Sequence, residues 1–148
     1  MGEPDIQSFR DLDAWKVAMD LTVLAYTVAK GLPDDERYEL SAQLRRASVS
    51  VPSNIAEGQS CGLNGRYIHH LRIALGSVDE LSTQIELALR LGLVQTADAA
   101  AVAKQLTRTR QLLFGLLRSR RRRRLLKTAT CLALLLCWFG VLWLAGLD

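Results

Sequence analysis

The fold is decided by the stretch QLRRASVSVPSNIAEG, residues 43–58. Apolar residues recur here at helical spacing, and with the residues before the stretch they form the row Leu40, Leu44, Ala47, Val51 and Asn54 or Ile55. An interior proline removes one helical hydrogen bond and clashes with the preceding turn. We therefore predict a helix that begins near Asp34 or Asp35 and either kinks or breaks near Ser48. A kink is favoured because the periodicity resumes after Pro52.

Three further stretches have helical periodicity. They cover about residues 12–32, ended by a Gly-Leu-Pro break, about residues 65–91, closed by Gly92, and residues from Thr96 towards a run of arginines. The predicted core rows are Ala14, Ala18, Leu21, Ala25, Val28 and Leu32; then Ile68, Leu71, Leu75, Val78, Ser82, Ile85 and Leu89; then Val102, Leu106, Thr109, Leu113 and Leu116. Gly76 lies inside the third helix, where glycine costs about 1 kcal/mol relative to alanine, so close helix packing is expected there.

Short connections between helices of similar length force antiparallel neighbours. The sequence thus predicts an all-α, up-down-up-down four-helix bundle over residues 11–117, after an N-terminal segment of residues 1–10. The first helix carries a second apolar row, Trp15, Met19, Thr22, Tyr26 and Ala29, that such a bundle leaves without a partner. This row predicts association with copies of the chain or with another protein. The alternative is that Trp15 and Tyr26 lean into a thick core.

The C-terminal part joins a basic collar, residues 118–127, to an uncharged stretch, residues 128–147. A helix of that length spans about 30 Å, the thickness of a bilayer core, and flanking positive charges favour the cytoplasmic side. We therefore expect a C-terminal apolar transmembrane helix in the bacterial inner membrane, with the bundle facing the cytoplasm. A cytoplasmic protein, with this stretch as a buried helix or an accidental extension of the reading frame, is the alternative. The collar consists of Arg118, Arg120, Arg121, Arg122, Arg123, Arg124 and Lys127.

Residues 43–58, together with FRDLDAWKVAMDL (9–21) and YIHHLRIALGSVDEL (67–81), resemble a bacterial four-helix-bundle family. This family includes proteins encoded in intervening sequences of large-subunit ribosomal RNA genes, and a relative is the accessory variability protein of diversity-generating retroelements. The resemblance covers about residues 9–117. It implies a four-helix bundle that forms ring-like homo-oligomers, with pentamers expected, and it transfers no catalytic residue. The relative's link to nucleic acid and a reverse transcriptase suggests similar partners for this chain. The family-motif residues expected to have structural roles are Pro52, Asn54, Glu57, Gly58 and Gly76.

Charge is distributed unevenly along the chain. The formal net charge is +4, yet residues 1–117 hold 12 Lys or Arg and 14 Asp or Glu, so the positive excess comes from the collar. A uniformly basic nucleic-acid-coating domain is therefore not indicated. The candidate nucleic-acid contacts are Arg45, Arg46, Arg66 and Arg72, which a multimer would repeat around a ring. The alternative is that they form salt bridges with the acids of the bundle.

Other side chains offer little chemistry. Asn54 and Glu57 lie on a helix that otherwise buries apolar residues, and we favour hydrogen bonds across helices over a catalytic site because no base or nucleophile accompanies them. The adjacent His69 and His70 point about 100° apart and cannot share a metal. No cofactor, metal or small-molecule substrate is expected. The predicted function is that of a non-enzymatic, homo-oligomeric interaction or scaffold protein tethered to membrane lipid. The alternative is a nucleic-acid-binding accessory protein with RNA, DNA or a reverse transcriptase as partner.

Overall fold

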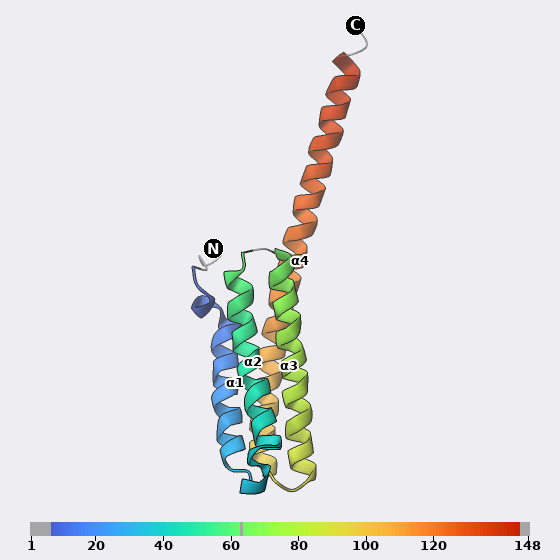
Figure 1. The fold of residues 1–148 in the computed structure, drawn as a ribbon. Helices are drawn as coiled ribbons and strands as arrows, with labels where there is room; N and C mark the ends of the chain where they lie inside the picture. The colour runs from blue at the N-terminus through green and yellow to red at the C-terminus, as the bar shows by residue number, and fades with distance from the viewer. Residues whose placement is uncertain (1–6, 63, 146–148) are drawn as a thin grey trace. The chain divides into compact units, whose positions relative to one another are not determined.

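All four predicted helices are present in the computed structural model (Figure 1). The structure describes residues 7–62 and 64–145, with the backbone only for residues 64 and 121–145. The helices are α1 (Asp13–Lys30), α2 (Leu40–Ser60), α3 (Asn64–Arg90) and α4 (Thr96–Ala145), and the 3-10 turns η1 (Phe9–Asp11) and η2 (Asp34–Arg37) precede α1 and α2. The prediction of an all-α chain with four helices is confirmed.

The chain forms two compact units, with the boundary between Gly115 and Leu116. In the first unit the helices alternate in direction, up-down-up-down (Figure 1). Helix α2 packs against both α1 and α3. Helix α4 is joined to α1 by a hydrogen bond from Gln105 Nε2 to the Val17 carbonyl (3.2 Å) and to α3 by the Arg110–Asp79 ion pair. The helices therefore follow one another around the bundle in chain order.

The predicted core rows of α1 and α2 are confirmed, with Leu40, Leu44, Ala47, Val51 and Ile55 of α2 buried, and the α4 row is confirmed except for Leu116, which is half-buried. Every residue of the predicted row in α1 is buried, and so are Val102, Leu106, Thr109 and Leu113 of α4. In α3 the buried residues include only Leu71, Val78 and Ile85 of the predicted row; the others are Tyr67, Ala74, Ser77, Leu81 and Ala88. The predicted row for α3 is thus only partly right, because two neighbouring apolar rows run along this helix and periodicity alone does not say which one faces the core.

Helix α2 runs without a break through Pro52. Proline has no N–H, so the carbonyl of Ser48, four residues earlier, lacks its helical donor. The hydroxyl of Thr22 on α1 fills that role: its Oγ1 lies 2.9 Å from the Ser48 carbonyl oxygen and 2.9 Å from that of Ala18. Ser48 is fully buried, and the half-buried Thr22 hydroxyl supplies its carbonyl with the donor that Pro52 lacks.

A second hydroxyl joins the same two helices. Ser41 on α2 donates to the Ala29 carbonyl at 2.7 Å, in the last turn of α1, where carbonyls lack partners within the helix. The predicted start of α2 at Asp34 or Asp35 is wrong, because the 3-10 turn η2 occupies that segment and α2 begins at Leu40. The carboxylate of Glu36 accepts instead from the Leu40 N–H at 3.2 Å and so caps the first turn of α2.

Gly58 sets the approach of α2 to α3. A Cβ atom there would lie 3.1 Å from the His70 Cβ and 3.2 Å from Tyr67 Cδ2. At Gly76 no described atom within 4 Å would meet a Cβ, so the close packing predicted for Gly76 is wrong. The close approach occurs one helix earlier, at Gly58. The predicted closure by Gly92 is confirmed: with φ of 71° it follows the end of α3, and its N–H donates to the Leu89 carbonyl at 3.0 Å.

In the part of the chain that the structure describes, no helix combines the length and apolar character needed to cross a membrane. This finding contradicts the predicted transmembrane helix over residues 128–147 and the predicted location in the bacterial inner membrane. A crossing helix needs about 20 consecutive apolar residues, whereas α1, α2, α3 and the described side chains of α4 include charged residues on their exposed faces. Of the predicted segment, residues 128–145 have a helical backbone, and residues 146 and 147 lie outside the described residues.

We predict that Thr22→Val destabilises the full chain by about 1–3 kcal/mol, because it leaves the buried Ser48 carbonyl without a donor. In a Pro52→Ala background the same substitution should cost much less, since alanine restores an N–H to that carbonyl. Urea unfolding at one fixed protein concentration measures both effects. Thr27→Val is the matched control, because the Thr27 hydroxyl bonds to Val23 within its own helix and is exposed. Equal losses in the two backgrounds would contradict this role for Thr22.

The two helical glycines should respond oppositely to alanine. Gly76→Ala is expected to stabilise the chain by about 1 kcal/mol through helix propensity, since the added methyl has open space around it. Gly58→Ala gains the same propensity but forces α2 and α3 apart, at a cost of about 1–3 kcal/mol, so a net loss is expected. Thermal and urea unfolding of both variants test the difference in sign. A stabilised Gly58→Ala variant would show that α3 can move away from α2 at little cost.

Candidate functional site

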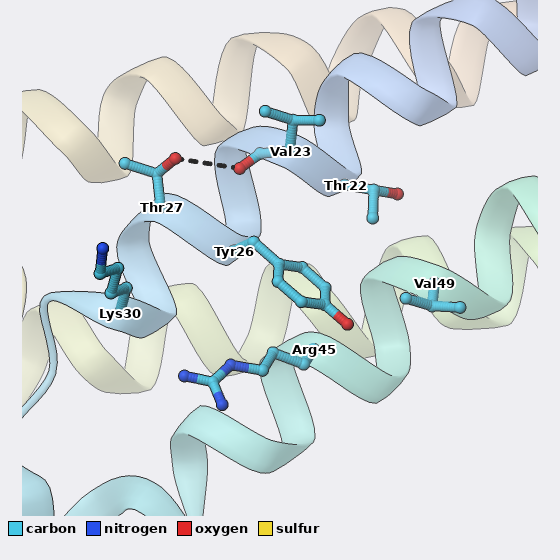
Figure 2. Close-up of a pocket in the computed structure, with 7 residues that line it drawn as sticks. All are labelled: Thr22, Val23, Tyr26, Thr27, Lys30, Arg45 and Val49. Atoms are coloured by element: carbon cyan, nitrogen blue, oxygen red, sulfur yellow. Dashed lines mark hydrogen bonds between the residues drawn. The ribbon is translucent and has the colours of Figure 1, made fainter.

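A groove runs along the outer side of α1 and α2. Its two parts, of about 670 Å³ and about 300 Å³, share Thr22 and Val49 and therefore form one continuous depression. We call it the α1/α2 groove. Figure 2 shows its larger part, where the Tyr26 ring extends from α1 towards Arg45 and Val49 of α2. The smaller part is lined by Trp15, Met19, Thr22, Val49, Pro52, Ser53 and Ala56.

Large apolar side chains of this groove remain in contact with solvent. The exposed fractions are 38% for Met19, 65% for Val23, 43% for Tyr26 and 41% for Val49. Since these residues come from adjacent helices and line a common depression, they form a contiguous apolar surface rather than scattered exposed side chains.

The second apolar row predicted for the first helix divides between core and surface. Ala29 is buried, and Trp15 is half-buried, with its ring 5.2 Å from the ring of Phe9 in an edge-on contact. Met19 and Tyr26 stay exposed. Ala29 and part of Trp15 therefore belong to the core, as the alternative of a thick core expects. Met19 and Tyr26 lie on the surface, as expected for a row without a partner in the bundle.

Positive charge lies at one end of the α1/α2 groove. Lys30 and Arg45 both line it, and the Arg45 guanidinium lies 5.9 Å from the centre of the Tyr26 ring, within the range of a cation–π contact. Among the residues that the structure describes, no carboxylate forms an ion pair with either cation. The groove thus offers an apolar surface and two charges free to meet an acidic partner.

The four candidate nucleic-acid contacts do not form one patch on a single copy. Arg45 lines the groove, whereas Arg46 follows it on the helix and points about 100° away. The hydroxyl of Ser77 donates to that of Ser50 at 2.8 Å, which sets the register of α3 on α2. In that register Arg72 lies level with Ile55, roughly 15 Å along the axis from Arg45.

Arg66 lies further still, in the first turns of α3. The alternative, in which the four arginines form salt bridges with acidic residues of the bundle, is not observed either. Over residues 7–62 and 65–120, none of the four arginines is in an ion pair. Arg46, Arg66 and Arg72 are exposed.

Asn54 and Glu57 take part in a polar cluster between α2 and α3. His70 Nδ1 lies 3.0 Å from Asn54 Oδ1 and 3.5 Å from a carboxylate oxygen of Glu57, and the Asn54 amide donates to the Ser50 carbonyl at 2.9 Å. These contacts bridge two helices, as the structural interpretation of Asn54 and Glu57 anticipates. Their shared partner is His70, which the sequence alone did not indicate.

The polar cluster lacks the arrangement of a hydrolytic site. The hydroxyls of Ser50 and Ser77 bond to each other rather than to His70, so no serine is activated by the imidazole in the contacts that the structure describes. Within the same described residues, no group of three or more His, Cys, Asp or Glu side chains is placed to hold a metal ion. The contacts of the cluster join α2 to α3.

The basic collar lies within α4, whose helical backbone continues through it. Arg118 is exposed and Arg120 is half-buried. The side chains of Arg121, Arg122, Arg123, Arg124 and Lys127 lie outside the described part of the chain. The collar belongs to the second unit, whereas the α1/α2 groove belongs to the first.

Six residues of the groove were not singled out from the sequence: Val23, Thr27, Lys30, Val49, Ser53 and Ala56. Val23 follows Thr22 of the second apolar row, so a wider row on α1 would have included it. Val49 and Lys30 gave no usable signal, because each becomes part of a groove only when α2 is laid against α1 in the observed register.

Comparison with known proteins supports the fold. A family model described as 23S rRNA-intervening sequence protein matches residues 10–115. A protein of unknown function from the S23 ribosomal protein family of Bacteroides thetaiotaomicron has a similar crystal structure, with a TM-score of 0.67 at 21% sequence identity, over 71% of this chain and 95% of that chain. At this identity the likeness concerns the fold alone. No curated protein matches the sequence.

Proposed function

Since the chain belongs to the 23S rRNA-intervening sequence protein family, we propose that it acts by association rather than by catalysis, as a homo-oligomeric four-helix-bundle interaction protein. The α1/α2 groove is the surface through which copies associate. The family resemblance noted from residues 43–58 is established by this match, whereas the function and the expected pentamer are part of the proposal.

The observation that carries the proposal is the exposure of Met19, Val23, Tyr26 and Val49 in one continuous groove. Leaving such side chains in water forgoes the free energy of burial, about 25 cal/mol per Å² of apolar surface. A contiguous apolar surface rimmed by charge is typical of a protein interface. Tyrosine and arginine side by side, as Tyr26 and Arg45 lie here, are also the residue types enriched in interface hot spots.

The non-enzymatic part of the proposal is supported by the polar groups of the first unit. Asn54, His70, Ser50 and Ser77 already satisfy one another between α2 and α3. The two parts of the α1/α2 groove are lined by hydroxyls, apolar groups and two cations, and Asp34 lines a neighbouring depression that shares Lys30 and Arg45 with the groove. The groove's hydroxyls and Lys30 would need an adjacent base to act as nucleophiles, and no hydrogen bond among the described residues joins Ser53, Tyr26 or Lys30 to one.

We predict that Tyr26→Asp shifts the full chain from oligomer to monomer, because it places a charge within the apolar interface. Analytical ultracentrifugation over a range of concentrations measures the shift, and an increase of at least about tenfold in the dissociation constant is expected. Leu87→Asp is the matched control: Leu87 is 47% exposed on α3 and lines neither part of the groove. Equal effects of the two substitutions, or a monomeric wild-type chain, would refute the proposal.

A second candidate function is nucleic-acid binding, favoured by one observation. Arg45 and Arg46 have no ion-pair partner among the described residues, so their charges remain available to phosphates. In an oligomer these two arginines would recur at regular intervals around the assembly. The pair is considered without Arg66 and Arg72, which lie on another level of the bundle.

For this second function we predict that Arg45→Gln/Arg46→Gln weakens RNA or DNA binding and flattens its salt dependence. The slope of log K against log salt should fall by about 0.7–0.9 for each arginine that binds a phosphate in the wild-type chain. Fluorescence anisotropy at several salt concentrations measures the slope. Lys104→Gln/Arg108→Gln, which removes the same charge from exposed positions of α4, is the control. Binding unchanged by the first pair would exclude the arginines as contacts.

A further inference from the structure

A polar depression continues the α1/α2 groove at its cationic end. It has a volume of about 250 Å³, and its lining includes Lys30 and Arg45, which it shares with the groove, together with Asp34, Arg37 and Ser41. We call it the η2 depression, because Asp34 and Arg37 belong to the turn η2. The η2 depression and the two parts of the groove thus form one continuous hollow that is polar at one end and largely apolar along the rest.

The η2 depression carries an uncompensated positive charge. Three cations, Lys30, Arg37 and Arg45, and one carboxylate, Asp34, leave a formal charge of +2 in its lining. Over residues 7–62 and 65–120, none of these four side chains is in an ion pair. The two guanidinium groups lie 5.6 and 5.9 Å from the centres of neighbouring tyrosine rings, and such contacts leave the charge in place. The depression can therefore bind an anion.

The other acids of η2 do not occupy these cations. The Asp35 carboxylate accepts from the Glu36 N–H at 3.1 Å, and the Glu36 carboxylate accepts from the Leu40 N–H at 3.2 Å. Both carboxylates are thus bonded to the backbone, and neither lines the η2 depression.

The larger part of the α1/α2 groove offers few hydrogen-bonding groups to a ligand. The hydroxyls of Thr22 and Thr27 already donate to main-chain carbonyls, at 2.9 and 3.1 Å. The side chains of Val23, Tyr26 and Val49 supply apolar surface. A base or a sugar would leave its polar groups without partners here, whereas an alkyl chain needs none.

The hollow is long enough for one extended chain. From Lys30 to Trp15, α1 rises by about 22 Å. Figure 2 shows Lys30 and Arg45 on one side of the Tyr26 ring and Val49 on the other. The smaller part of the groove shares Val49 and ends at Trp15, so the apolar surface continues away from the cations. This order of charge and apolar surface matches a molecule with an anionic head and a single alkyl tail.

We propose that the η2 depression and the α1/α2 groove together bind a fatty acid. Its carboxylate lies at the three cations, where arginine can donate two parallel hydrogen bonds. Its alkyl chain runs along Tyr26 and Val49 towards Trp15, and the burial of this chain strengthens binding. A bound chain covers the surface through which copies associate, so the fatty acid competes with association; this consequence rests on the proposed function.

Calorimetric titration of the full chain with octanoate, dodecanoate and hexadecanoate, each below its micelle concentration, tests the site. Each methylene that reaches the groove should strengthen binding by up to about fourfold. Dodecanol, which lacks the charge, should bind at least about tenfold more weakly than dodecanoate. Affinities that do not depend on chain length, or inorganic phosphate that binds as tightly as dodecanoate, would show a site for small anions and overturn the proposal.

Two pairs of variants locate the head and the tail. Lys30→Gln/Arg45→Gln should weaken dodecanoate binding at least about tenfold, whereas Lys104→Gln/Arg108→Gln, which removes the same charges from exposed positions of α4, should not. Ser53→Trp fills the smaller part of the groove, so it should weaken the binding of hexadecanoate but not of octanoate. Ser60→Trp, at an exposed serine of the same helix, should affect neither. Circular dichroism checks that each variant is folded, and equal losses for both acids in Ser53→Trp would contradict the proposed path of the tail.

The outcomes separate the fatty-acid site from the proposed association. Analytical ultracentrifugation with saturating dodecanoate should shift an oligomeric wild-type chain towards monomer, and an oligomer that binds dodecanoate without dissociating overturns the competition. A monomeric wild-type chain that binds the acids with the expected dependence on chain length overturns the proposed function but supports the site. An oligomer that Tyr26→Asp disrupts, but that binds none of the three acids, overturns the site alone.

Discussion

The carbonyl oxygen of Ser48 has no donor within its own helix, because Pro52 stands where an N–H is required, and the hydroxyl of Thr22 supplies one from α1. An unpaired carbonyl in a dry interior is costly, so this contact restricts how α1 can sit on α2. The Ser41 hydroxyl on the Ala29 carbonyl enforces the same register further along the two helices. Two hydroxyl groups thus fix the pair of helices that carries the α1/α2 groove.

The groove follows from that register. With Thr22 held against Ser48, Tyr26 comes beside Arg45, and Met19 comes beside Val49 and Pro52. On the other side of α2, Gly58 and the Asn54–His70 contact bring α3 close by a different means, a missing side chain together with a polar cluster. Helix α2 is therefore hydrogen-bonded to both neighbours, and the α1/α2 contact differs in leaving an apolar groove on its outer side.

Particular elements show how far the sequence could be followed. The α1 row is predicted correctly because its 4-3-4-3-4 spacing points in one direction, and the α4 row is correct for the same reason except at Leu116, which is half-buried. The α3 row is only partly right. Two adjacent apolar rows begin at Ile68 and at Tyr67, and the row that begins at Tyr67 is the one that is buried. Close helix packing was expected at Gly76, but the close approach of two helices occurs at Gly58. The predicted transmembrane helix fails, because no helix in the described part of the chain meets the length and apolar character required.

The sequence by itself determined the helical class, the number of helices, the buried face of α1, and the presence of a second apolar row with Met19 and Tyr26. These depend on periodicity and on glycine and proline, which act over a few neighbouring residues. Only the tertiary structure decided that Thr22 serves the Ser48 carbonyl, that His70 joins Asn54, and that Arg45 and Val49 share a groove with Tyr26. Each of these pairs lies on two helices, and the contacts exist only once the register between the helices is set.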